Sequence, residues 1–115
     1  MGSISVACYR PKPGCEAALL ELVRNHLPPL RAEGLVTGRA SIVMRTKDGV
    51  IVEVFEWVSQ EAIAGAHKNP VVLELWKQFE AVCRYETPST LPEFQTMFSH
   101  FEPVRFAQGT APGAA

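Results

Sequence analysis

The sequence shows no excess of one charge sign and no long apolar run. Eleven Lys and Arg residues balance 12 Asp and Glu residues in a chain of 115, and no block of like charge stands out. A nucleic-acid-binding surface or a polybasic membrane patch is therefore not expected. No apolar stretch approaches the roughly 20 residues of a membrane span, and the N-terminus lacks the basic-then-apolar layout of a signal peptide.

Cysteine is also scarce. Cys8, Cys15 and Cys83 are an odd number, without CxxC or Cys/His ligand spacing. With no export signal, this favours a reducing, cytoplasmic setting. No three residues show metal-ligand spacing, and the chain has neither a Gly-rich phosphate loop nor a nucleophile elbow, so we expect no metal site.

Alternating, β-prone segments predict four strands, at residues 4–10, 37–46, 50–58 and 96–104. The middle two are joined by Asp48-Gly49, one of the strongest short hairpin signals. Residues 1–106 are expected to form one domain, because domains usually run from about 50 to about 250 residues. The Ala/Gly/Pro-rich residues 107–115 are expected to form a flexible tail.

Two amphipathic helical segments lie between the strands. The first covers residues 15–34, and Pro28 and Pro29 must break or kink it. The second begins after Ser59, a helix N-cap, and restarts at Pro70, which suits a first helical position. The resulting βαββαβ order predicts a ferredoxin-like α+β fold, with an antiparallel four-stranded sheet and helices on one face.

The third strand is apolar on both faces. Two helical layers cover only one face of a four-stranded sheet, so the other needs a partner. We therefore predict a homodimer that packs sheet against sheet. The residues of the uncovered face are Val50, Val52 and Val54, and those of the face under the helices include Ile51, Phe55 and Trp57.

Two titratable residues stand near the end of this strand. Glu53 is expected under the helices, where a carboxylate either takes part in proton chemistry or pairs with Arg39 or Arg45 across the hairpin; the ion pair is favoured. His67, at the end of the short helix, either accepts a proton from a phenolic ligand or bonds a free helix-end carbonyl.

Several aromatic residues are candidates for a ligand site. Trp57 and Trp76 either form the flat walls of an aromatic-ligand site or fill the core. Tyr9 is placed to offer a hydroxyl group to a ligand, and Phe79 lies on the apolar stripe of the last helix. His26 lies on an apolar stripe beside the proline break, where a hydrogen-bonded core histidine is favoured over a ligand.

Residues 56–62, Glu-Trp-x-Ser-x-Glu-Ala, followed by His67 and Pro70 and preceded by the Asp48-Gly49 hairpin, resemble the antibiotic biosynthesis monooxygenase family of dimeric α+β barrels. The match in element order extends over most of residues 4–104. It implies a homodimer with one small pocket per subunit, between sheet and helices. In the cofactor-independent oxygenases of the family, a deprotonated quinol or anthrone passes an electron to O2 directly, so neither metal nor flavin is needed.

Trp57 matches the tryptophan that lines the pockets of this family, and the candidate residues above supply the other roles of such a site. His67 or Glu53 would remove the proton, and the wall around a small aromatic substrate would be formed by Trp57, Trp76, Phe55, Tyr9, Ile63 and Phe79. Glu53 and Ile63 replace an asparagine and a helix tyrosine of a polyketide-modifying member. The positions of the asparagine, tryptophan and axial histidine of the haem-degrading branch hold Ala7, Ala66 and Trp76, so haem breakdown is not expected.

Two functions follow from the resemblance. The first is a cofactor-free monooxygenase, an oxidoreductase of small aromatic or quinol-type compounds. The alternative is a non-catalytic, small-ligand-binding or stress-associated dimer with the same pocket, because a fold does not determine a function.

Overall fold

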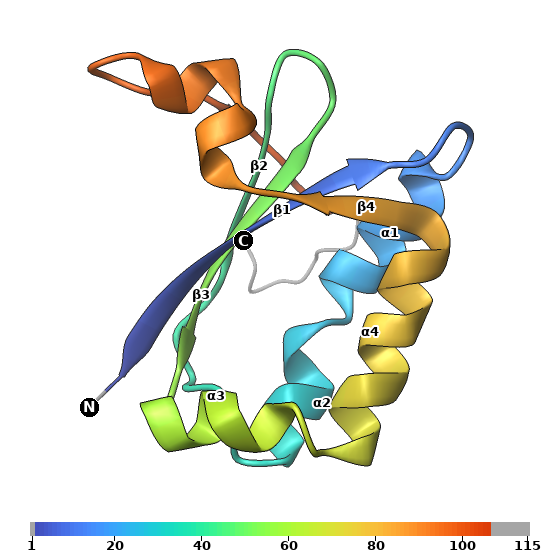
Figure 1. The fold of residues 1–115 in the computed structure, drawn as a ribbon, viewed down its shortest axis with the longest axis vertical. Coiled ribbons are helices and arrows are strands. Elements are labelled where there is room, and N and C mark those ends of the chain that lie inside the picture. Colours follow the sequence, from blue (N-terminus) through green and yellow to red (C-terminus); the bar gives the residue numbers. More distant parts are fainter. Residues whose placement is uncertain (1, 107–115) are drawn as a thin grey trace.

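Two long antiparallel strands form the centre of the molecule (Figure 1). The computed structural model describes residues 2–106 as an α+β fold, and the predicted tail at 107–115 lies outside the described residues. Within 2–106 the sheet has five strands, in the order β4-β1-β3-β2-β5. The strands are β1 (Ser3–Pro11), β2 (Ile42–Arg45), β3 (Ile51–Trp57), β4 (Cys83–Glu86) and β5 (Glu102–Pro103).

The predicted last strand at 96–104 is wrong in most of its length. Only Glu102–Pro103 pairs with β2, and the strand beside β1 is instead Cys83–Glu86. This strand follows helix α4 (Pro70–Val82) without a loop, because Cys83 turns directly into an extended conformation. Cys83 is therefore the first residue of a strand. The strand is only four residues long, too short for a recognisable alternation.

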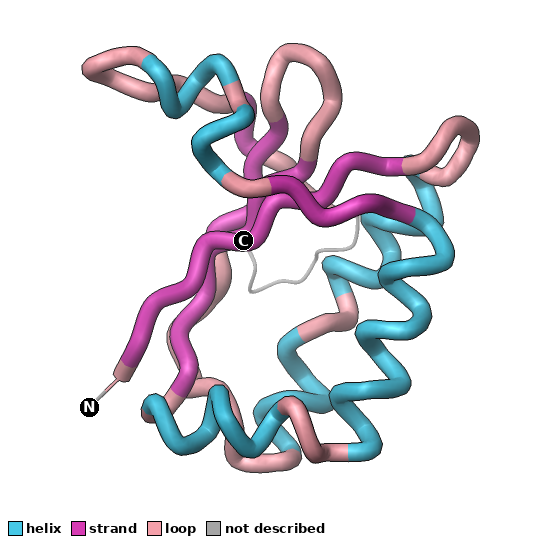
Figure 2. Tube along the Cα trace, in the orientation of Figure 1, coloured by secondary structure: helices cyan, strands magenta, loops and turns pink. Residues whose placement is uncertain are grey.

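The other helices are α1 (Glu16–Arg24), α2 (Leu27–Ala32) and α3 (Gln60–Ala66). As predicted, the first helical segment breaks near the two prolines, which both lie in the first turn of α2, where no intrahelical N–H is needed. The predicted Ser59 cap and the restart at Pro70 are confirmed: the Ser59 side chain accepts from the backbone N–H of Ala62, and α4 begins at Pro70 with Asn69 as its N-cap. Figures 1 and 2 show the described helices α1 to α4 on one face of the sheet.

The opposite face is partly covered by the chain that follows β4. This segment contains the two short 3-10 turns η1 (Pro88–Thr90) and η2 (Pro92–Gln95). Its Leu91 is fully buried against Val50 and Val52, which are fully buried as well. The prediction that these two valines need a second subunit to cover them is therefore wrong.

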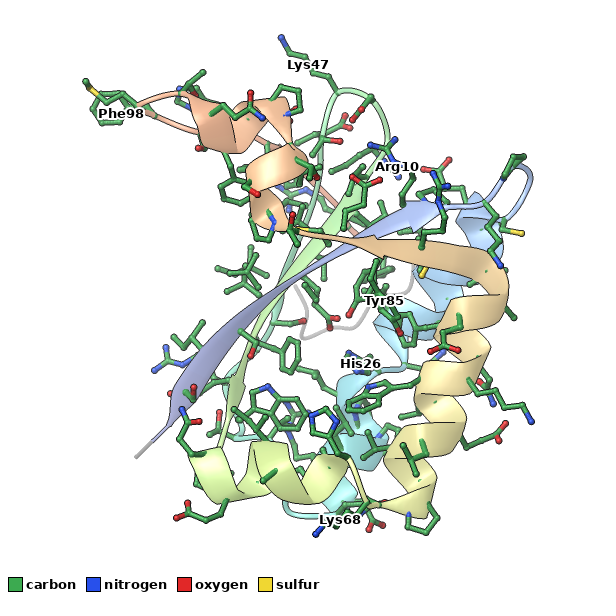
Figure 3. The ribbon with its side chains drawn as sticks, in the orientation of Figure 1. Arg10, His26, Lys47, Lys68, Tyr85 and Phe98 are labelled. Carbon is green, nitrogen blue, oxygen red and sulfur yellow. The ribbon has the colours of Figure 1, made fainter. Side chains whose placement is uncertain are left out.

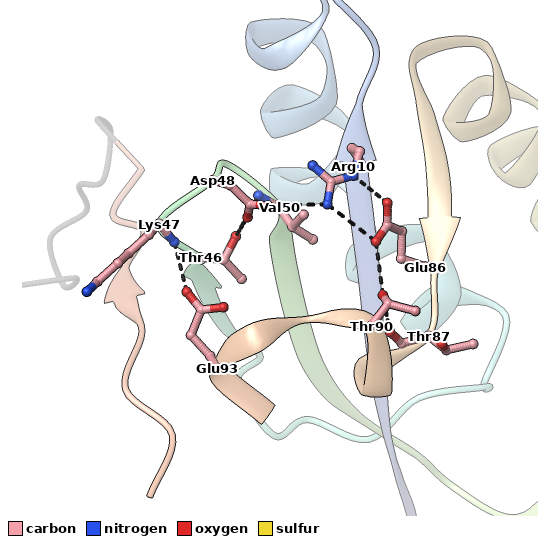
Figure 4. Close-up of polar contacts among 9 residues, drawn as sticks. All are labelled: Arg10, Thr46, Lys47, Asp48, Val50, Glu86, Thr87, Thr90 and Glu93. Carbon is pink, nitrogen blue, oxygen red and sulfur yellow. Dashed lines mark hydrogen bonds and ion pairs between the residues drawn. The ribbon is translucent and has the colours of Figure 1, made fainter. Parts of the chain in front are cut away.

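Polar contacts hold this C-terminal segment, residues 87–101, against the sheet and the β2–β3 turn (Figure 4). The backbone N–H of Lys47 donates to a Glu93 carboxylate oxygen at 2.9 Å. The Thr90 hydroxyl donates to Glu86 at 3.0 Å, and Glu86 pairs in turn with Arg10 on β1. The segment is thus bonded at both of its 3-10 turns.

The rest of this face stays apolar and exposed among the described residues. Val6 lies opposite Val54, and Val54 lies opposite Ile42, so the three form one row across β1, β3 and β2. Val6 and Ile42 are 42% and 61% exposed, and Ile4, two residues before Val6, is 58% exposed. We call Ile4, Val6, Ile42 and Val54 the open apolar row. Within 2–106 no helix is long and apolar enough to cross a membrane.

Candidate functional site

A cavity of about 300 Å³ lies between the sheet and the helices. Its size is at the lower end of the range for small-molecule sites, and its wall is mostly apolar and aromatic, as such sites usually are. The wall is formed by Ser5, Ala7, Tyr9, His26, Phe55, Trp57, Ile63, His67, Trp76, Phe79, Glu80 and Tyr85.

The structure brings most of the predicted site residues together at this cavity. The wall includes each of the six residues expected to contact substrate, namely Tyr9, Phe55, Trp57, Ile63, Trp76 and Phe79, and also His67. Glu53 is the exception. Its side chain is fully buried and stands behind the wall, bonded to residues that line it.

Strand alternation places these groups. On β3, Glu53, Phe55 and Trp57 share the face under the helices, because side chains two residues apart point the same way. On β1, Ala7 lies opposite Glu53 and Ser5 lies opposite Phe55. The Ser5 hydroxyl accepts a hydrogen bond of 3.0 Å from the Trp57 indole N–H, which fixes the orientation of that ring in the wall.

A buried polar cluster of Tyr9, His26 and Glu53 lies at the inner end of the cavity. The Tyr9 hydroxyl donates to Glu53 Oε1 at 2.8 Å. His26 Nδ1 lies 2.9 Å from Oε1 and 3.2 Å from Oε2 of the same carboxylate. The three residues come from β1, the α1–α2 junction and β3, and each is at most 3% exposed. Hydrogen bonds from two elements thus compensate for burying the carboxylate.

This cluster changes the interpretation of two residues. The predicted pair of Glu53 with Arg39 or Arg45 is wrong: Arg39 binds Glu56 at 2.9 Å and Arg45 binds Glu16 at 3.1 Å. Arg39 is exposed and Arg45 is partly buried, and each is paired with a carboxylate other than Glu53. His26 is a hydrogen-bonded core histidine as predicted, but it also lines the cavity.

The Tyr9 hydroxyl is held in its neutral form. Burial raises the pKa of Tyr9 well above its ordinary value, and the adjacent Glu53 charge and hydrogen bond raise that pKa further. A neutral phenol donates its proton to the carboxylate, so Tyr9 acts as a fixed donor. Its ring stacks on Phe79 with centroids 5.0 Å apart, while the His26 ring meets Phe79 edge-on at 5.1 Å.

His67 occupies a different environment, at the end of α3. It is an exposed residue, and its ring meets the Trp76 ring edge-on at 5.1 Å. Among residues 2–106 its ring forms no hydrogen bond, so the predicted alternative of a bond to a helix-end carbonyl is not seen there. His67 therefore stands at the solvent side of the cavity, whereas His26 stands deep within it.

Sequence reasoning missed several wall residues. Tyr85 was missed because the short strand that carries it, β4, was not predicted. Burial raises the pKa of Tyr85 to about 12. Glu80 lies one residue after Phe79 on α4, outside the apolar stripe. The sequence did contain an indication for His26, because a histidine among apolar residues needs a buried hydrogen-bonding partner and Glu53 was also expected under the helices. In the described part of the chain, no three His, Cys, Asp or Glu side chains are arranged to hold a metal ion.

Comparison with known proteins shows the fold and no more. No protein-family model and no curated protein matches the chain. Among solved structures it is similar to Rv0793 from Mycobacterium tuberculosis, with 21% identity, 76% of this chain and 95% of that chain covered, and a TM-score of 0.58. It is also similar to NE2512, a protein of unknown function from Nitrosomonas europaea, with 17% identity, 97% and 96% coverage and a TM-score of 0.53. At these identities the likeness concerns the α+β fold alone.

Proposed function

We propose that this protein is a cofactor-independent monooxygenase of the antibiotic biosynthesis monooxygenase type, acting on a small aromatic or quinol-type compound. The observation that carries the proposal is the cavity: a small, mostly aromatic chamber with two histidines in its wall. A flat ring fits between aromatic walls, and a histidine titrates near neutral pH, where it can remove a phenolic proton.

The proposed reaction begins with proton removal. Trp57 and Trp76 hold the ring, and His67 in the wall, or Glu53 through its hydrogen-bonded partners, takes the proton. The electron-rich anion then transfers one electron to O2, and the substrate radical and superoxide combine into a peroxide at a ring carbon that carries hydrogen. The peroxide takes up the proton held by the protein and loses water, which leaves one oxygen atom on the ring as a carbonyl group.

The same proposal includes the finer architecture and the assembly. The elements from β1 to β4 follow the order β-α-β-β-α-β, with both helical segments interrupted, and β5 adds a short edge strand. This order supports a ferredoxin-like fold of the dimeric α+β barrel kind. The open apolar row supports a homodimer through the sheet face, since contiguous exposed apolar side chains on a sheet mark an interaction surface.

Oxygen uptake with a panel of quinols and anthrones tests the enzyme. We expect oxygen uptake by the wild-type protein, and we expect the rate of uptake to fall at least tenfold in one or both of the variants His67→Ala and Glu53→Gln. His100→Ala is the matched control, because His100 is exposed and does not line the cavity. No uptake with any compound, or uptake unchanged in both cavity variants, would refute the catalytic role.

The alternative is a binding protein that holds a small aromatic ligand without converting it. One observation favours it: the exposed His67 ring has no hydrogen-bonding partner within 2–106 that would orient it for catalysis. Calorimetric binding of the same compounds, with no oxygen consumed, would select this function. Mass spectrometry of molecules that co-purify with the protein would identify the ligand class.

A further inference from the structure

His26 and Tyr9 are the most deeply buried titratable side chains in the cavity wall, and His26 is the one that can accept a proton from a ligand. It is 3% exposed and yet lines the cavity, so its small accessible surface faces the cavity and not the outside. Figure 3 shows it pointing from the start of α2 into the space between the sheet and α4. Phe55 and Phe79 meet the ring edge-on, with centroids 5.4 and 5.1 Å away, and fix its position.

The hydrogen bonds of the ring determine which nitrogen carries the proton. Nδ1 faces both oxygens of Glu53, and a carboxylate accepts hydrogen bonds, so Nδ1 is the protonated nitrogen. The Tyr9 hydroxyl also donates to this carboxylate, so both of its neighbours in the cluster are hydrogen-bond donors. In neutral His26 the other nitrogen, Nε2, therefore carries a lone pair.

Nε2 is left open to a ligand. Among residues 2–106 it has no hydrogen-bond partner, and the buried side-chain atoms without a partner there are Arg45 Nε and Glu93 Oε1. Nε2 is thus not sealed off by protein atoms. It is an oriented acceptor at the inner end of an apolar cavity, where a bound hydroxyl group would be its partner.

We propose that His26 is the proton acceptor of this site, with Glu53 as its positioning residue and a neutral phenol or quinol as its ligand. The ligand O–H bond breaks, an Nε2–H bond forms, and the resulting phenolate lies beside an imidazolium that Glu53 stabilises. This assignment rests on the proposed function only for the later reaction with O2. The proton transfer itself needs no co-reactant.

The charges around the cavity select a neutral ligand. The titratable groups that face His26 are Tyr9 on β1, Glu53 on β3, Glu80 on α4, Tyr85 on β4 and His67 at the end of α3. Neither lysine nor arginine contributes to the described wall. An aromatic carboxylate would therefore meet the Glu80 carboxylate in the wall, with the Glu53 carboxylate behind it and no lysine or arginine to pair with, whereas an uncharged phenol meets an oriented base.

Titration with 4-nitrophenol tests the proposal, because its phenolate absorbs at longer wavelength than the neutral phenol. Below the pKa of the free probe, we expect the wild type to bind it as phenolate, and His26→Gln to lower the bound phenolate fraction at least tenfold. His67→Gln should weaken binding but leave the bound probe ionised, and His100→Gln should change neither. Glu53→Gln should reduce the phenolate fraction, because the imidazolium loses its counter-charge.

Three results would overturn the proposal: no binding of 4-nitrophenol to the wild type, an unchanged phenolate band in His26→Gln, or loss of the band in His67→Gln alone. If His26→Gln does not fold, nitrogen NMR of the wild type decides. His26 should carry its proton on Nδ1 when free and become doubly protonated when the probe binds. A His26 that stays neutral in the complex would equally overturn the proposal.

Oxygen uptake separates this proposal from the proposed function. A phenolate band without uptake of O2 by any quinol would leave His26 as the proton acceptor of a binding protein and refute the monooxygenase. Uptake that His26→Gln leaves unchanged would preserve the monooxygenase and refute the role of His26.

Discussion

The two faces of the sheet bury their central residues in opposite ways. Under the helices, Glu53 is buried with two polar partners that come from other elements. On the other face, Val50 and Val52 are buried by Leu91, and only apolar contact is needed. Apolar residues of similar volume often stabilise a core as well as a buried ion pair does. A carboxylate next to a cavity therefore suggests a chemical role, whereas the valine face is explained by packing.

Removing the carboxylate should have the largest effect on stability. Glu53→Ala leaves His26 and Tyr9 buried without their shared acceptor and opens a cavity, so we expect a loss of about 3–5 kcal/mol in the free energy of unfolding. Urea denaturation measures the loss. Glu56→Ala is the control, since Glu56 pairs with Arg39 at the surface and should cost about 1 kcal/mol or less. Equal losses in the two variants would show that the cluster has no special importance for the fold.

On the opposite face, truncating the residue that covers the valines should have a smaller but still large effect. Leu91→Ala removes a fully buried side chain from contact with Val50 and Val52 and should cost about 2–4 kcal/mol. The matched control is Leu73→Ala, because Leu73 is 46% exposed on α4. If Leu91→Ala and Leu73→Ala unfold at the same urea concentration, the C-terminal segment does not cover this face in solution.

The comparison of the faces also shows what the sequence could predict. Alternation in β3 assigned Glu53, Phe55 and Trp57 to the helix face, and Ser59 and Pro70 located the helix starts, because these signals are local. The cover of the valine face was missed, since it depends on a segment more than 30 residues later that has no regular period. The strand carrying Tyr85 was missed for the same reason: it is short and joined directly to a helix.

The polar cluster could be predicted only in part. The sequence indicated that Glu53 and His26 each needed a buried partner, but it could not indicate that they were partners of one another. Their side chains are 27 residues apart and meet because the α1–α2 junction brings His26 above β3. The arginines of the hairpin were nearer in sequence, and they bind other carboxylates instead.

A substitution in the open apolar row tests whether the exposed part of the sheet face opposite the helices is a dimer interface. Val54→Lys places a charge in the middle of the row, between Val6 and Ile42. We expect the proposed dimer to dissociate at micromolar concentration, with the stability of the monomer fold changed by about 0.5 kcal/mol or less. Light scattering measures the mass. Leu73→Lys, an exposed apolar position on the helical side, should leave the mass unchanged. A wild-type protein that is already monomeric would refute the sheet-face dimer.

Among the buried polar groups, the smallest effect on stability is expected for the Tyr9 hydroxyl, and it depends on pH. Tyr9→Phe removes one hydrogen bond to Glu53 and should cost about 1 kcal/mol at neutral pH. Burial and Glu53 raise the pKa of Tyr9 above that of the unfolded chain, so the unfolded state loses this proton first. The stabilisation is complete below about pH 10 and declines as the pH rises toward the folded-state pKa, by up to about 1.4 kcal/mol per pH unit. Urea denaturation from pH 8 to pH 11 measures the free energy of unfolding of the wild type and of Tyr9→Phe, and the difference between the two should shrink above pH 10. Cys83 and Tyr85 are present in both proteins, so their contributions cancel in this difference. A difference that stays constant or grows would mean that Tyr9 ionises freely in the folded protein and that the helix face is not closed around Glu53.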